Sequence, residues 1–239
     1  MGRMGSKPYK DEVYQEKRKP KTPIKFNISL DEEQKKAKAK ILDSTISIIN
    51  GKAGSGKSTL AAQIALDLLF NNEKERIIVT RAMVVAGDEE IGFLPGSKDE
   101  KLAPFTTPVY DCMNRLYKKD KIEAMIQNGE IEVVPFAWMR GRSFSNCIII
   151  VDEAQNATKL QMELVLTRID KGTKVILCGD QKQIDLKNKK QSVFAKLKDK
   201  FVNRKGYNVI DLKVNYRDPI VDDVIELFEE IEAEESNKE

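Results

Sequence analysis

The residues best suited to chemistry in this chain lie in a glycine-rich segment, Gly51-Lys52-Ala53-Gly54-Ser55-Gly56-Lys57-Ser58. The segment matches the phosphate-loop pattern G-x-x-x-x-G-K-S/T and lies between a β-branched run and an apolar helical pattern, which is the context that this motif requires. Glycines let backbone amides converge on phosphate oxygens, and the N-terminus of a following helix adds partial positive charge. The sequence therefore predicts a site for a nucleoside triphosphate.

Two side chains of this loop have predicted tasks. The Lys57 ammonium is expected to reach the β- and γ-phosphates, and the Ser58 hydroxyl is expected to ligate Mg²⁺. A chance match to the motif arises in roughly one chain of this length in a hundred, so an ordinary glycine-rich turn is the weaker interpretation. The residues predicted to hold the nucleotide, ATP, are Gly51, Ala53, Gly54, Ser55, Gly56, Lys57, Ser58 and Thr59.

Two adjacent carboxylates follow a continuous apolar run. Cys147–Val151 predicts a strand that is covered on both faces, with Asp152 at its carboxyl end and Glu153 next. Parallel strands end at the same edge of a sheet, so we expect Asp152 to hold a Mg²⁺-bound water beside the phosphate loop. Glu153 is then placed as the general base for an attacking water. An acid pair after a strand is a weak signal alone, but together with the phosphate loop it predicts hydrolysis of ATP.

A third polar loop follows another apolar run. Lys174–Gly179 predicts a strand, and Asp180-Gln181-Lys182-Gln183 comes directly after it. If this strand lies near the other two, Gln183 approaches the γ-phosphate. An ordinary polar turn explains the same residues equally well.

Composition excludes several classes of protein. The chain has no histidine, which excludes Ser-His-Asp and Cys-His nucleophile systems. Its three cysteines are widely spaced, and Cys147 and Cys178 lie beside or inside apolar runs, which predicts that these two thiols are buried. Such cysteines fit a reducing compartment, and we expect a cytoplasmic protein. The apolar run Ile148–Val151 is far too short to cross a membrane. Net charge is only +3, but it is unevenly placed: residues 1–25 are strongly basic and residues 222–239 strongly acidic.

Short apolar runs alternate with helical patterns along the chain, which predicts an α/β fold with a mostly parallel sheet and helices on both faces. We expect one domain at 23–232, a flexible basic arm at 1–22 and an acidic tail at 233–239. Ser29 is the expected N-cap of the first helix. The predicted helices are Leu30–Lys40, Ser58–Phe70, most of Pro108–Asn128, Thr158–Ile169 and Pro219–Ile231. The predicted strands are Thr45–Asn50, Arg76–Thr80, Ile131–Phe136, Cys147–Val151, Lys174–Gly179 and Val209–Val214.

Further motifs give the chain a family resemblance. Asp152-Glu153-Ala154-Gln155, Gly179-Asp180-Gln181-Lys182-Gln183 and Asn215-Tyr216-Arg217 resemble, in this order, motifs two, three and four of superfamily-one helicases. More closely, the chain resembles the PhoH-like (phosphate-starvation-inducible) ATPase family over residues 24–231. That resemblance is carried by Thr80-Arg81, Gly92-Phe93-Leu94-Pro95-Gly96, Pro108-Val109-Tyr110-Asp111, Met139-Arg140-Gly141-Arg142, Val151–Asn156 and Gly179–Leu186.

The resemblance implies a single RecA-like P-loop NTPase core that acts on RNA or single-stranded nucleic acid. It also implies that Gln183 senses the γ-phosphate, that Arg217 contacts it, and that Gln34 reads the adenine edge. Helicases close two such cores on ATP and this chain has length for one, so either Arg217 folds back in cis or a neighbouring subunit supplies an arginine in trans. The second arrangement predicts a homo-oligomeric ring, a hexamer by analogy. Arg140 and Arg142 are further candidates for that arginine.

The coupled process is left open by the sequence. Arg81 and the segments Phe93–Phe105 and Trp138–Arg142 mix aromatic and basic residues, as nucleic-acid contacts do, although single aromatics more often pack in a core. ATP-dependent remodelling of a protein and nucleotide-kinase phosphotransfer are the alternatives. A kinase needs an arginine-rich lid and has no use for the acid pair, and a regulatory GTPase needs a guanine-reading motif that does not occur here.

Overall fold

The computed structural model describes residues 24–82 and 98–236 of the 239-residue chain. The predicted basic arm and the Gly92–Gly96 motif lie outside the described residues. The strands are β1 (Ile46–Asn50), β2 (Arg76–Arg81), β3 (Ile131–Val133), β4 (Cys147–Asp152), β5 (Lys174–Gly179) and β6 (Tyr207–Asp211). The helices are α1 (Glu32–Leu42), α2 (Lys57–Phe70), α3 (Lys98–Leu116), α4 (Lys119–Gln127), α5 (Lys159–Leu166), α6 (Phe194–Phe201) and α7 (Pro219–Ser236).

The strands form a six-stranded sheet in the order β3-β2-β4-β5-β1-β6 within the described chain. Each pair of neighbouring strands in this sheet is parallel. The strand β5 separates β1, which leads into the phosphate loop, from β4, which leads into the acid pair. This order is that of a RecA-like core. It brings the carboxyl ends of the three chemistry-bearing strands to one edge of the sheet.

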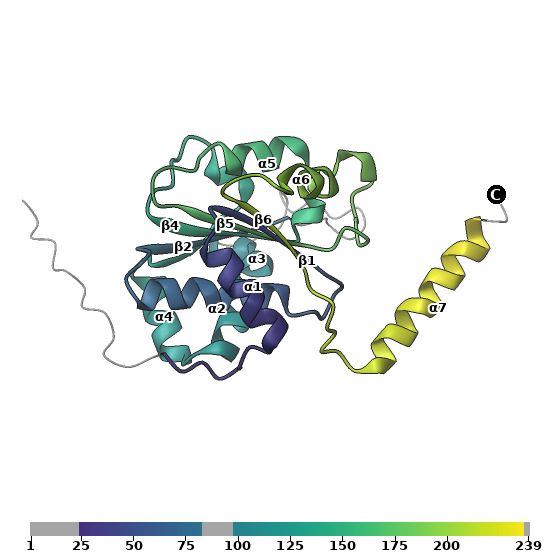
Figure 1. Ribbon diagram of the computed structural model, residues 1–239, viewed down its shortest axis with the longest axis horizontal. Coiled ribbons are helices and arrows are strands. Elements are labelled where there is room, and N and C mark those ends of the chain that lie inside the picture. Colours follow the sequence, from purple (N-terminus) through teal and green to yellow (C-terminus); the bar gives the residue numbers. More distant parts are fainter. Residues whose placement is uncertain (1–23, 83–97, 237–239) are drawn as a thin grey trace, which may run out of the picture.

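Helices cover both faces of the sheet (Figure 1). On one face α1, α2, α3 and α4 enclose a core that includes Leu60, Ile64 and Met113. On the other face α5 and α6 enclose a second core around Phe144 and Phe194. Every residue of β4 is buried, because the strand is covered from both sides. The predicted α/β fold with a parallel sheet is confirmed.

Several predicted element boundaries were wrong. The N-cap of α1 is Asp31 rather than Ser29, because the Asp31 carboxylate accepts the Gln34 backbone N–H at 2.7 Å and Gln34 completes a capping box. The predicted strand to Phe136 ends at Val133, and a 3₁₀ turn at Phe136–Met139 buries Phe136 instead. Strand β6 begins earlier and ends earlier than predicted, and helix α6 was not predicted at all.

The last helix, α7, stands away from the rest of the molecule in Figure 1. Its start suits a helix, because Pro219 takes the first helical position and the Asp218 carboxylate accepts the Ile220 N–H at 3.1 Å. The helix continues to Ser236. No helix in the described part of the chain is long and apolar enough to cross a membrane.

Candidate nucleotide-binding site

A groove of about 650 Å³ lies at the edge of the sheet where the phosphate loop begins. Its walls come from segments far apart in the chain: the start of α1, the phosphate loop, the ends of β2 and β4, helix α3 and the segment that precedes α7. The lining residues are Ile28, Ser29, Gln34, Ala53, Gly54, Gly56, Lys57, Ser58, Thr59, Arg81, Pro108, Cys112, Arg115, Asp152, Glu153, Tyr216 and Arg217.

Two glycines of the phosphate loop occupy conformations that other residues rarely adopt. Gly54 and Gly56 have φ angles of +84° and +78°. A Cβ on Gly54 would lie 2.5 Å from the Arg217 Cγ, and a Cβ on Gly56 would lie 2.8 Å from the Gln34 Nε2. The loop is therefore shaped for close approach of its backbone to other groups, as a phosphate cradle requires.

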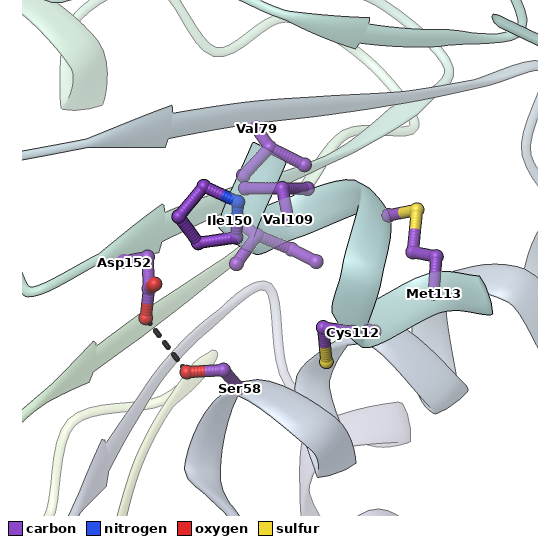
Figure 2. A pocket seen from close by; sticks show the side chains of 9 residues that line it. Ser58, Val79, Val109, Cys112, Met113, Ile150 and Asp152 are labelled. Atoms are coloured by element: carbon purple, nitrogen blue, oxygen red, sulfur yellow. Dashed lines mark hydrogen bonds between the residues drawn. The ribbon is translucent and has the colours of Figure 1, made fainter. Parts of the chain in front are cut away.

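The two predicted magnesium residues meet in the structure. The Ser58 hydroxyl, at the start of α2, donates a hydrogen bond to the Asp152 Oδ1 at 2.8 Å (Figure 2). A hydroxyl and a carboxylate that converge beside a phosphate loop form an oxygen donor set of the kind that Mg²⁺ takes together with phosphate and water oxygens. The described residues hold no cluster of three or more acidic, cysteine or histidine side chains suited to a metal.

Lys57 lies inside the loop that it is predicted to serve. Its ammonium donates hydrogen bonds to the carbonyl oxygens of Gly51 at 2.7 Å and Lys52 at 2.9 Å. These bonds hold the charge at the loop, within the groove. A bound phosphate would offer the ammonium a charged acceptor in place of a carbonyl.

Glu153 is held by its neighbours in an unusual backbone conformation. Its φ of +49° is in the left-handed region, which is uncommon for a residue other than glycine. The Gln155 Nε2 donates to the Glu153 Oε2 at 2.8 Å, and the Arg81 guanidinium lies 3.5 Å from the other carboxylate oxygen. The buried Gln155 also accepts the Asp180 backbone N–H at 3.1 Å. Gln155 thus joins the predicted base to the loop after β5, a connection that sequence reasoning missed.

Three residues predicted to act at the nucleotide site, Gln183, Arg140 and Arg142, do not line the groove formed by the described residues. Gln183 follows β5 at the correct edge, but it is exposed and is not among the described residues that line the groove. Arg142 makes two hydrogen bonds to the Glu132 carboxylate, at 2.8 and 2.7 Å, and stacks on the Phe144 ring. The Glu132 hydrogen bonds raise the pKa of Arg142. In this subunit neither Arg140 nor Arg142 lines the groove formed by the described residues.

Gln34 also lines the groove and is buried against Gly56, and its contact with the adenine edge stays a prediction. Tyr216, for which the sequence predicted no role, lines the same wall, donates its hydroxyl hydrogen bond to Asp31 and has its ring beside Gly56. Burial and the hydrogen bond to Asp31 raise the pKa of Tyr216 to about 12. The Gln34 backbone N–H and then the Tyr216 hydroxyl lower the pKa of Asp31.

A small apolar cavity of about 30 Å³ lies behind the Ser58 and Asp152 pair. Figure 2 shows Cys112 and Met113 of α3 among the residues that line it. Cys112 is buried, as are Cys147 and Cys178, and burial raises the pKa of each thiol. Burial was predicted for Cys147 and Cys178, and it is confirmed.

A glycine-rich phosphate loop on the β1 to α2 turn, facing an acid pair at the end of β4, defines a P-loop NTPase. Residues 28–229 match the family model described as PhoH-like protein. The chain belongs to the PhoH-like protein family.

Curated relatives support this assignment. The chain is 42% identical over 184 residues to a PhoH-like protein of Synechocystis, covering 76% of this chain and 56% of the relative. It is 40% identical over 181 residues to a PhoH-like protein of Bacillus subtilis, covering 75% and 56%. It is 44% identical over 138 residues to the protein PhoH of Escherichia coli K12, covering 57% and 39%. The chain thus spans about half the length of the curated relatives it matches, or less.

Solved structures show more distant likeness. The Pif1 helicase from Candida albicans is 18% identical, with a TM-score of 0.37, covering 79% of this chain and 40% of that one. Bacteroides Pif1 bound to single-stranded DNA is 17% identical, with the same TM-score, covering 83% and 46%.

Proposed function

We propose that this protein hydrolyses ATP with Mg²⁺ and couples hydrolysis to RNA or single-stranded nucleic acid. The single observation that carries the ATPase part is the meeting of Ser58 with Asp152, with Glu153 next to them on the same groove. Acids paired in this way beside a phosphate loop serve a reaction with water, because one orders the metal's water shell and the other accepts a proton.

In the proposed reaction, a water oxygen attacks the γ-phosphorus and its proton passes to the Glu153 carboxylate. The bond between that phosphorus and the β–γ bridging oxygen breaks, and ADP and inorganic phosphate leave. Mg²⁺, held through Ser58 and Asp152, would neutralise the phosphate oxygens. Lys57 would balance charge on the β- and γ-phosphates, and the loop amides would fix the chain of phosphates in line.

Charge that develops on the γ-phosphoryl group needs a further cation, and an arginine there is worth on the order of 10³–10⁵ in rate. Arg217 lies against Gly54 within the same subunit and is our first candidate. The second is an arginine from a neighbouring copy, Arg140 or Arg142, in a homo-oligomeric ring that we propose to be a hexamer. Full ATPase activity in a verified monomer would exclude the second arrangement.

The nucleic-acid role is supported by charge beside the site. Arg81 ends β2 at the groove, and its guanidinium lies 3.5 Å from the Glu153 carboxylate. A nucleic-acid phosphate that attracted Arg81 would therefore remove this ion pair from the proposed catalytic carboxylate. Trp138, two residues before Arg140 in the chain, is 46% exposed and offers a stacking surface. Phe93 lies outside the described residues. Remodelling of a protein partner and phosphotransfer to a nucleotide remain the alternative proposals.

The test is phosphate release from ATP and from GTP, with and without RNA, for the wild type and Glu153→Gln. We expect Glu153→Gln to lower kcat by about 10²–10⁴ while ATP binding is retained. The matched control is Glu163→Gln on α5, since Glu163 is an exposed carboxylate paired with Lys159 and far from the groove lining. Equal activity in both variants would contradict the role of Glu153. Phosphate transfer to an added nucleoside would overturn hydrolysis in favour of a kinase.

A further inference from the structure

Helix α7 exposes a continuous apolar stripe. Ile220, Val224, Leu227, Phe228 and Ile231 recur at helical spacing, which places them on one face. Ile220, Leu227 and Phe228 are 60%, 57% and 63% exposed, whereas side chains of the same types in the body are largely buried. An amphipathic face of this size on an otherwise polar protein marks a contact surface.

The remaining faces of α7 are acidic. The helix contains eight aspartates and glutamates and no lysine or arginine. Two such helices laid against each other would bring like charges together at close range, which opposes pairing of α7 with a second α7. The helix therefore suits an acceptor that combines apolar area with positive charge.

This chain carries such a surface around α6, which we name the basic face. It combines the exposed apolar side chain of Val202, 53% exposed, with the cationic side chains of residues 186–205, in which the exposed Asp199 on α6 is the one acid. The exposed basic residues of this face are Lys189, Lys190, Lys196, Lys200, Arg204 and Lys205.

The segment 212–217, which precedes α7 and which we call its root, is hydrogen-bonded to the strand and loop that form the nucleotide groove. The Leu212 N–H donates to the Asn50 carbonyl at 2.8 Å and the Tyr216 N–H donates to the Gly54 carbonyl at 3.1 Å. These bonds direct the chain across the phosphate loop, and α7 then extends away from the body, as Figure 1 shows. The described part of this chain therefore leaves the stripe of α7 uncovered.

We propose that α7 docks, with its apolar stripe inward, on the basic face of a second copy of this chain. The contact is head-to-tail, so it repeats from subunit to subunit and closes into a ring where the rotation allows. Because α7 starts two residues after Arg217, docking also sets the position of that arginine and brings the neighbour to the edge of the groove. Only this link to catalysis rests on the proposed ATPase function.

The first test measures the oligomeric state of the full chain by sedimentation across a concentration series. We expect Phe228→Asp to raise the concentration for half-assembly at least tenfold, because it places a charge in the buried stripe. Leu160→Asp on α5 is the matched control, since Leu160 is 74% exposed and lies outside both surfaces, and it should leave assembly unchanged. Both substitutions are at exposed positions, and unchanged thermal unfolding would confirm that each variant folds. A wild type that stays monomeric, or equal assembly of both variants, would overturn the proposal.

The second test uses complementation. The double variant Lys196→Glu/Lys200→Glu, with a damaged basic face, should also stay monomeric. A mixture of it with Phe228→Asp should form a heterodimer and nothing larger, because one intact α7 meets one intact basic face. Pairing of α7 with α7 would give no heterodimer and would refute the proposal. Loss of RNA binding without loss of assembly in the lysine variant would assign the basic face to nucleic acid instead.

ATP hydrolysis is measured on the same samples. If the wild type releases no phosphate while it and Glu153→Gln both assemble, the proposed ATPase function is wrong and the docking proposal stands. Hydrolysis by a wild type that never assembles would defeat the docking alone.

Discussion

Helices α2 and α7 are both amphipathic by sequence, but in the described structure only the apolar face of α2 is covered by the rest of the chain. Nine of the fourteen residues of α2 are buried between the sheet and α1, α3 and α4. Five apolar side chains of α7 are exposed, and the sequence of the helix is strongly acidic. Helix α2 positions the phosphate loop by rigid packing. Helix α7 follows a segment that bonds to the same loop, and its apolar stripe is uncovered.

The difference separates two kinds of requirement. A phosphate cradle must be held within fractions of an ångström, so its helix is built into the core. An arm that reaches another molecule must keep its contact face free until the partner arrives. The two meet at the segment 212–217, which bonds to the phosphate loop before it leads into α7.

The sharpest test of this contrast is truncation in the core of α2. Leu66 is fully buried, so Leu66→Ala should lower the free energy of unfolding by about 2–5 kcal/mol through lost burial and a residual cavity. Denaturant unfolding at low protein concentration measures the change. A loss below about 1 kcal/mol would mean that the core relaxes around the gap and that α2 is less rigidly packed than the structure indicates.

The next effect concerns the connection from Gln155 to Glu153. If Glu153 is the base that we propose, Gln155→Ala should lower kcat for ATP by about 10–100-fold with little change in KM, since Glu153 loses its 2.8 Å hydrogen bond while the phosphate loop is unchanged. The control is Gln161→Ala, which removes the capping box of α5 and should affect stability only. A rise in KM with unchanged kcat would place Gln155 in substrate binding instead.

A smaller effect is expected where α1 meets the root of α7. Asp31→Ala removes the N-cap of α1 and the acceptor of the Tyr216 hydroxyl, and should lower the free energy of unfolding by about 1 kcal/mol. The folded pKa of Asp31 lies below its usual value, so this contribution is present above about pH 4 and is lost as pH falls through the lowered pKa. Wild type and variant should therefore converge in stability in acid; a constant difference down to pH 2 would contradict the assignment.

The smallest effect is expected in α7 itself. Leu227→Ala should change the unfolding free energy of the dilute chain by less than about 0.5 kcal/mol, because the side chain is 57% exposed. The same measurement at a concentration that allows assembly should show a larger loss. A large loss at every concentration would mean that α7 packs on its own subunit in solution, and would break the contrast with α2.

Much of the fold was predictable from local pattern. The continuous apolar run of β4 and the strand and helix that flank the phosphate loop are strong local signals, and they fixed the α/β class and the parallel sheet. The boundaries of the elements were harder to predict. The N-cap at Asp31 depends on a hydrogen bond from its backbone N–H to the Gln34 side chain. The turn at Phe136 forms because that ring is buried in the second core. Helix α6 was missed although Phe194, Leu197 and Phe201 recur at helical spacing, because a periodic segment of only eight residues is easily taken for part of a loop.

By itself the sequence determined the phosphate loop, the acid pair and the order of the motifs, because each depends on residue types at fixed spacing along the chain. Only the tertiary structure decided which distant side chains share the groove. It brought Tyr216 and Asp31 together from 185 residues apart and joined Gln155 to the loop after β5. It also placed Arg142 on Glu132 rather than in the groove, and it left the stripe of α7 uncovered. Periodicity shows that a helix has an apolar face, but only packing shows whether its own subunit covers that face.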